Sequence, residues 1–171
     1  RLNNVDDVAA VFNHIVVPTN RESSLLLKHI AIEGRTPVAL PSSLTTGTVT
    51  SCSDELGIEL LDCKYGTNYT TLSLRITNNG ANYCNLQLKG GNSGYAYDDQ
   101  GHKLSGSNMS VALSGDSYTP SSTSTEIPAG IFTNAFIRLY NVDSASTEFT
   151  YITVPTNQGR DLIFQNVKIR K

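Results

Sequence analysis

The chain has 171 residues, of which 39% are hydrophobic and 16% are charged, and its formal net charge is -2 at pH 7. This length allows one sizeable core. The near-neutral charge excludes a strongly basic nucleic-acid-binding surface. The lack of a run of about 18 apolar residues argues against membrane insertion. Because charged residues fall below the roughly 25% of ordinary soluble domains, Ser, Thr, Asn and Gly must cover much of the surface, as they often do in extracytoplasmic β-proteins.

The first 34 residues repeat the last 34 without a gap, at a constant offset of 137 positions. Thirteen of the 34 aligned pairs are identical, whereas typical residue usage would give roughly 2 by chance. The repeat therefore indicates duplication of a unit of domain size. The organisation predicted from it is the C-terminal strand pair of a preceding, truncated copy at residues 1–34, a junction at 35–56 and a complete β-sandwich domain at 57–171.

The duplicated segments are expected to share their secondary structure. Residues 13–17 and 25–32 should be strands equivalent to residues 150–154 and 162–169, and a helix at 25–32 would contradict the equivalence. Since 34 residues cannot bury a core by themselves, this strand pair must pack against other protein. There are three options for this packing. The strand pair docks on the complete module, it pairs with another part of the first module, or two molecules associate through their N-terminal strands.

Alternation of apolar and polar residues with period two dominates the rest of the chain, which is typical of half-buried antiparallel strands. Seven or eight short strands at this spacing predict an all-β fold, a two-sheet antiparallel immunoglobulin-like sandwich, because alternating faces need a second sheet to pack against. The clearest strands are residues 58–65, 72–77, 84–88, 131–140, 148–154 and 162–169. The inward side chains expected at the centre of the core are Leu72, Leu74, Ile76, Leu86, Leu88, Ile137 and Leu139.

Cys52, Cys63 and Cys84 are the cysteines of the chain, and none belongs to a CxxC pair. A bridge between Cys52 and Cys63 would suit an oxidising compartment, and reduced, buried thiols are the alternative. No His and Cys stand at zinc-ligand spacing. Neither a metal nor another cofactor is therefore expected.

The predicted hairpin around Asp98 and Asp99 carries the candidate polar site. Clustered carboxylates suit calcium, but the alternating acidic pattern of a calcium loop is missing, so a solvated hairpin turn is the alternative. His102 next to this pair suggests acid–base catalysis, which requires a titratable group held close to a substrate. An exposed turn provides neither burial nor a cleft, so the protein is not expected to be an enzyme.

Tyrosines are concentrated in one half of the module, at positions 65, 69, 83, 95 and 97. Many sandwich domains bind sugars by stacking such amphipathic rings on pyranose faces, and the alternative is that these rings cap the core at strand ends. Tyr95 and Tyr97 are two apart in a strand and should share a face. The predicted ligand-binding residues are therefore Tyr95, Tyr97, Asp98 and Asp99.

Two segments fit the Asn-X-Ser/Thr glycosylation acceptor pattern. They are Asn68-Tyr69-Thr70 and Asn108-Met109-Ser110, and in a bacterial chain both would be coincidental.

Three turn-containing segments carry a family resemblance: LSLRITNNG at residues 72–80, AYDDQGHKL at 96–104, and EIPAG at 126–130 ahead of the strand FIRLYNV. In this succession the chain resembles a broad class of immunoglobulin-like domains of secreted and lipid-anchored bacterial surface proteins, most of them uncharacterised. His102 stands where that class usually has Asn. The resemblance implies a non-enzymatic module outside the cytoplasm, often present in tandem copies, and it implies no particular ligand.

The sequence thus predicts a non-catalytic structural or interaction module of a secreted or cell-surface protein, used for adhesion, spacing or ligand presentation. Its expected partner is a protein or polysaccharide at the cell surface and not a nucleic acid. The alternative is a carbohydrate-binding module that uses Tyr95 and Tyr97.

Overall fold

The computed structural model describes residues 11–17, 25–31 and 45–171. The chain divides into two compact units, Arg1–Pro41 and Ser42–Lys171. In the first unit, β1 (Val11–Val17) pairs antiparallel with β2 (Leu25–Ala31). The prediction of two strands is confirmed over residues 13–17 and 25–31, and residue 32 of the predicted second strand lies outside the described residues.

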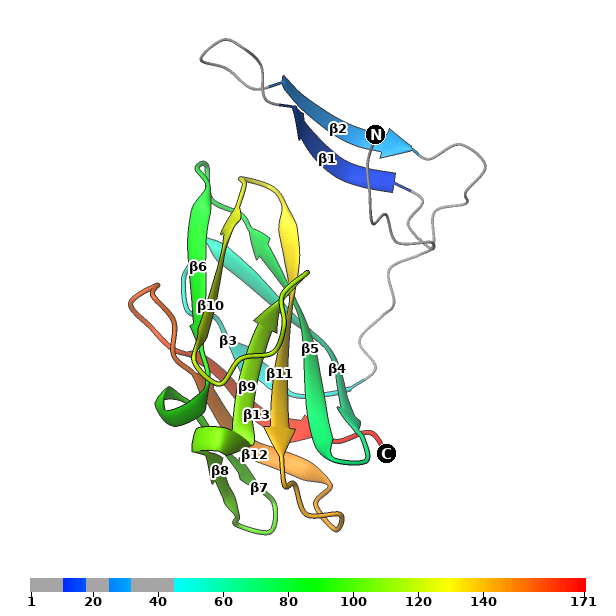
Figure 1. The fold of residues 1–171 in the computed structure, drawn as a ribbon, viewed down its shortest axis with the longest axis vertical. Helices are drawn as coiled ribbons and strands as arrows, with labels where there is room; N and C mark the ends of the chain where they lie inside the picture. Colours follow the sequence, from blue (N-terminus) through cyan, green and yellow to red (C-terminus); the bar gives the residue numbers. More distant parts are fainter. Residues whose placement is uncertain (1–10, 18–24, 32–44) are drawn as a thin grey trace. The chain divides into compact units, whose positions relative to one another are not determined.

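The second unit is an all-β, two-sheet antiparallel sandwich of the immunoglobulin-like kind (Figure 1). One sheet has four strands in the order β4-β5-β11-β9, the other has five in the order β3-β13-β12-β7-β8, and β10 and β6 form a separate pair. No helix among the described residues is long and apolar enough to span a membrane. The elements are β3 (Thr48–Thr50), β4 (Leu56–Tyr65), β5 (Tyr69–Asn78), β6 (Cys84–Lys89), η1 (Gly91–Ser93), β7 (Tyr95–Asp98), β8 (Lys103–Ser105), η2 (Gly106–Asn108), β9 (Met109–Leu113), β10 (Ser122–Ile127), β11 (Phe132–Tyr140), β12 (Glu148–Val154) and β13 (Leu162–Lys168).

The strand pair of the first unit matches β12 and β13 residue for residue. Adding the offset of 137 to the bounds of β1 and β2 gives the bounds of β12 and β13. The pairing register is also the same, since Val17 pairs with Leu25 as Val154 pairs with Leu162, and the other recorded pairs shift by the same offset. The N-terminal strand pair therefore duplicates the C-terminal strands, as the sequence predicted.

The two sheets of the second unit share one hydrophobic core. Side chains of β5 alternate regularly between buried and half-buried along the whole strand, and Phe149 and Phe164 of the five-stranded sheet are fully buried in the same cluster. Each fully buried apolar side chain of this size stabilises the fold by about 1.5–3 kcal/mol. The predicted core is confirmed, because none of its members is exposed: Leu72, Leu74, Ile76, Leu86, Leu88, Ile137 and Leu139.

Two strands lie where none was predicted. β3 falls inside the predicted junction 35–56 and pairs with β13, so the sandwich unit starts before residue 57. β10 consists mostly of Ser and Thr, without the alternation of apolar and polar residues that predicts a strand, and it pairs along its length with β6. Thr123 and Ile127 of β10 are buried. Short polar residues become a strand here because a partner strand offers its backbone hydrogen-bonding groups.

All three cysteines are free. Of the two alternatives left open by the sequence, the structure has reduced thiols rather than a Cys52–Cys63 bridge. Burial raises the pKa of Cys63 to about 12, with a contribution from the neighbouring Asp62. Burial also raises the pKa of Cys52 and, with Glu55 nearby, that of Cys84. These thiols are therefore packing residues with little thiolate character at neutral pH.

Candidate functional site

Asp98 ends β7 and organises the hairpin that leads into β8. Its Oδ1 accepts hydrogen bonds from the backbone N–H groups of Gln100, at 3.0 Å, and His102, at 2.8 Å. Its Oδ2 accepts one from Ser146 Oγ at 2.7 Å, and the Nδ1 of His102 lies 3.1 Å from the same oxygen. The carboxylate is thus surrounded by donors of the protein itself.

The prediction that this turn is solvated is wrong for Asp98, because only 2% of the residue's surface is exposed. Burial alone would raise the pKa of this carboxyl group, but the hydrogen bonds from Ser146 and His102 outweigh it and hold the pKa below its ordinary value. Asp98 is therefore ionised at neutral pH, and its oxygens are occupied by the hairpin and by the loop before β12. These contacts give Asp98 a structural role in the hairpin, and the ligand-binding role predicted for it stays a prediction.

Ser146, Asp98 and His102 include the residue types of a hydrolase triad, but their order is different. A nucleophilic serine must contact the imidazole that takes its proton. Here Ser146 Oγ donates to Asp98 instead, and Ser146 is fully buried while the His102 side chain is 55% exposed. The aspartate lies between the other two residues, so this set stabilises the loop and does not activate a nucleophile.

Asp99 ties the same hairpin to the loop before β12. Its carboxylate accepts hydrogen bonds from the hydroxyl of Thr147, at 2.6 Å, and from the backbone N–H of Thr147, at 3.1 Å to the same oxygen. The hydroxyl contact is the main reason that the pKa of Asp99 is lowered. For calcium, further oxygen ligands would be needed, and within residues 45–171 no three His, Cys, Asp or Glu side chains cluster in a way that could hold a metal ion.

Tyr95 and Tyr97 lie on one outer face of the five-stranded sheet and meet edge to face, with ring centroids 5.8 Å apart. Tyr151 of β12 stacks on Tyr95 at 5.9 Å, with an angle of 25° between the rings. The ammonium group of Lys103 lies 4.8 Å from the centroid of Tyr95, a cation–π contact. We call these four residues the tyrosine face.

The sequence indicated only two members of the tyrosine face. Tyr151 and Lys103 join it through strand register, since both are cross-strand partners of Tyr97. The position of Lys103 could have been predicted from the register of the hairpin around residues 98–102. The position of Tyr151 could not, because it depends on the pairing of β12 with β7. Within the tyrosine face, the ring most available for a sugar is that of Tyr97, which is 36% exposed, whereas Tyr95 and Tyr151 are half-buried.

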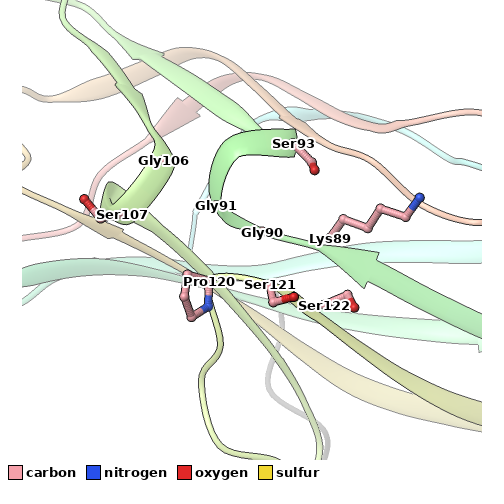
Figure 2. A pocket seen from close by; sticks show the side chains of 9 residues that line it. All are labelled: Lys89, Gly90, Gly91, Ser93, Gly106, Ser107, Pro120, Ser121 and Ser122. Carbon is pink, nitrogen blue, oxygen red and sulfur yellow. The ribbon is translucent and has the colours of Figure 1, made fainter.

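A separate surface hollow of about 540 Å³ lies between η1, η2 and the start of β10 (Figure 2). Its walls combine glycine backbone with the hydroxyl groups of serines, and no aromatic residue is among the described residues that line it. At Gly91, where φ is +55°, a Cβ atom would lie 2.1 Å from the carbonyl oxygen of Pro120, so this wall requires glycine. The lining residues are Lys89, Gly90, Gly91, Ser93, Gly106, Ser107, Pro120, Ser121 and Ser122.

Comparison with known proteins assigns no family. No family model matches the chain, and no curated protein matches it. Among solved structures, an ASH/PapD-like domain of human CEP192 (PapD-like domain 7) is similar, with 13% sequence identity and a TM-score of 0.39 over 79% of this chain and 99% of that domain. Similarity at this level transfers no activity or partner to the chain.

Proposed function

We propose that the chain is a non-catalytic structural and interaction module of an extracytoplasmic, cell-surface protein in which the sandwich recurs in tandem. The module spaces or presents other parts of that protein, and it contacts a protein or polysaccharide through its loops and exposed strand edges. The low content of charged residues and the resemblance of the turn segments to those of immunoglobulin-like surface domains support this proposal.

One observation carries it: every buried apolar position of the C-terminal strand pair has an apolar equivalent in residues 12–32. In the sandwich these positions bury against the four-stranded sheet as part of one core. The equivalent residues therefore have the pattern that a second sandwich of the same kind requires. The buried residues are Phe149, Ile152, Val154, Leu162, Phe164, Val167 and Ile169, and their equivalents are Phe12, Ile15, Val17, Leu25, Leu27, Ile30 and Ile32.

A chimera tests the equivalence directly. Residues 148–169 are replaced by the sequence of residues 11–32, which keeps the apolar pattern and, among the core positions, exchanges Phe164 for Leu and Val167 for Ile. We expect a cooperative urea transition with a loss of about 1–3 kcal/mol, because the exchanged core side chains differ modestly in volume. In the control chimera the same insert is shifted by one residue, so the apolar side chains point to the wrong face. If both chimeras are unfolded, the tandem proposal is wrong.

Localisation is tested on intact cells that express the complete gene. A membrane-impermeant amine-reactive biotin label should modify the protein before lysis. Modification that occurs only after lysis would contradict an extracytoplasmic role.

The exposed ring of Tyr97 is the specific observation in favour of the second candidate, a carbohydrate-binding module. Affinity electrophoresis in gels that contain neutral polysaccharides would detect it. Retardation of the wild type that disappears in Tyr97→Ala would support this candidate over a purely structural module.

A further inference from the structure

A second hollow, of about 490 Å³, lies where three segments distant in sequence meet: the β4–β5 turn, η2 and the end of β11. Its volume falls within the range of roughly 300–1,000 Å³ found for small-ligand sites. We call it the tyrosine–asparagine pocket. The lining residues are Tyr65, Thr67, Asn68, Tyr69, Ser107, Asn108, Tyr140, Asn141 and Val142.

The lining of this pocket is polar but uncharged. Three tyrosine rings and three asparagine side chains dominate it, with one threonine and one serine hydroxyl beside them, and no Asp, Glu, Lys, Arg or His is among the described lining residues. Asparagine amides both donate and accept hydrogen bonds, and tyrosine combines an apolar ring with a polar hydroxyl group. None of these lining residues offers a counter-charge to a charged ligand, and the charged group recorded against the wall is the guanidinium of Arg138, 4.1 Å from the ring centroid of Tyr69.

The amide groups on one side of the pocket are held in place. Asn141 adopts a left-handed backbone conformation, with φ of 57°, and its Nδ2 donates a hydrogen bond of 2.8 Å to Oδ1 of Asn108. This bond leaves the Nδ2 donors of Asn108 and the Oδ1 acceptor of Asn141 for a ligand. The bond thus fixes the two amides relative to each other before any ligand binds.

The aromatic side is also fixed by contacts. Tyr69 and Tyr140 are cross-strand partners and meet edge to face, with centroids 6.0 Å apart. The guanidinium carbon of Arg138 lies 4.1 Å from the centroid of Tyr69 and 3.5 Å from that of Tyr118, so Arg138 is held between two rings. The adjacent turn is closed by a hydrogen bond from the N–H of Gly66 to the carbonyl of Tyr69 at 2.8 Å. Preformed walls of this kind reduce the entropy lost on binding.

We infer that the tyrosine–asparagine pocket binds a neutral oligosaccharide. A pyranose ring has an apolar C–H face that suits a tyrosine ring, and its hydroxyl groups both donate and accept, as the paired amides of Asn108 and Asn141 do. The hollow between η1 and η2 lacks aromatic rings among its described lining residues, so it offers no such face. The pocket is separate from the tyrosine face and does not depend on the tandem arrangement.

The binding test uses the full chain, produced in a host without N-glycosylation because Asn68 and Asn108 each begin an Asn-X-Ser/Thr acceptor segment. The probes are neutral oligosaccharides of glucose, galactose, mannose, xylose and N-acetylglucosamine, at millimolar concentration, with oligogalacturonate as the charged comparison. Changes in amide ¹H–¹⁵N chemical shifts report the site. We expect at least one neutral probe to shift residues 65–69, 107–108 and 140–142, and oligogalacturonate to shift none of them.

The matched variants are Asn68→Ala and Asn108→Ala in the pocket and Tyr97→Ala on the tyrosine face. Losing one or two ligand hydrogen bonds should weaken binding about tenfold in each pocket variant, while Tyr97→Ala should bind as the wild type does. Amide spectra without ligand confirm that each variant is folded. Absence of binding to every neutral probe, shifts confined to other residues, or loss of binding only in Tyr97→Ala would each overturn the inference.

Discussion

Replacing Asp98 with alanine should destabilise the sandwich by about 3 kcal/mol. The substitution leaves the hydroxyl of Ser146, which is fully buried, without its acceptor, and an orphaned buried group of this kind costs about 1–3 kcal/mol. The backbone N–H groups of Gln100 and His102 lose their acceptor as well, which adds roughly 0.5–1.5 kcal/mol each because the turn is only partly buried. These contributions overlap, so the sum is an upper bound. Asp98→Asn keeps Oδ1 and should lose about half as much.

The contribution of Asp98 to the free energy of unfolding should also depend on pH. The pKa of Asp98 is lower in the folded protein than its ordinary value, which is about 3.9 in the unfolded chain. Its stabilising contribution is therefore complete well above this value and is lost as the pH falls through the folded pKa. Asp98→Asn lacks this ionisation, so the difference in unfolding free energy between wild type and variant should be largest near neutral pH and shrink in acid.

Urea unfolding followed by far-ultraviolet circular dichroism measures these differences, because the chain has no tryptophan. Asp54→Asn serves as the matched control, since Asp54 has a 94% exposed side chain and contacts only an exposed arginine in the recorded ion pairs. The control should stay within about 0.5 kcal/mol of the wild type. An equally small effect for Asp98→Ala, or a pH-independent difference for Asp98→Asn, would refute the reasoning.

Three further outcomes can be measured on the same protein. Gly91→Ala should lower the unfolding free energy by more than about 2 kcal/mol, because φ is positive and a Cβ atom would collide with a carbonyl oxygen. Gly101→Ala should lower it by only about 1 kcal/mol, because φ is positive there but the space around it is open. Equal losses in urea unfolding would contradict this reasoning. Phe164→Ala should lower the unfolding free energy by about 3–5 kcal/mol, since the ring is fully buried, and a loss below that of a surface substitution would argue against its place in the core. In native protein, Ellman's reagent should modify the half-buried Cys84 before Cys63, whose pKa is about 12; the reverse order would contradict the burial of Cys63.

Most of the strands could be predicted because their information is local. The alternation in residues 72–77 places Leu72, Leu74 and Ile76 on one side of any extended chain, and the structure buries all three. β10 was missed for the opposite reason. Its Ser and Thr residues resemble a surface segment, and only the presence of β6 makes them a strand.

The candidate site was predicted less well than the fold. Alternation along β7 put Tyr95 and Tyr97 on a common face, and that is confirmed, but no local pattern shows that Tyr151 stacks on Tyr95. Asp98 was expected in solvent because turn residues usually are. It is buried because folding brings Ser146, 48 positions away, to its carboxylate.

The order of residues alone reveals the strands, the central core positions and the duplicated strand pair, since these depend on periodicity and on identity at a constant offset. The three-dimensional fold decides which side chains meet across strands and loops. It joins residues 65–69, 107–108 and 140–142 into one pocket and places the Asp98 carboxylate among donors. Such sites combine residues far apart in the chain, and sequence spacing does not encode distances of that kind.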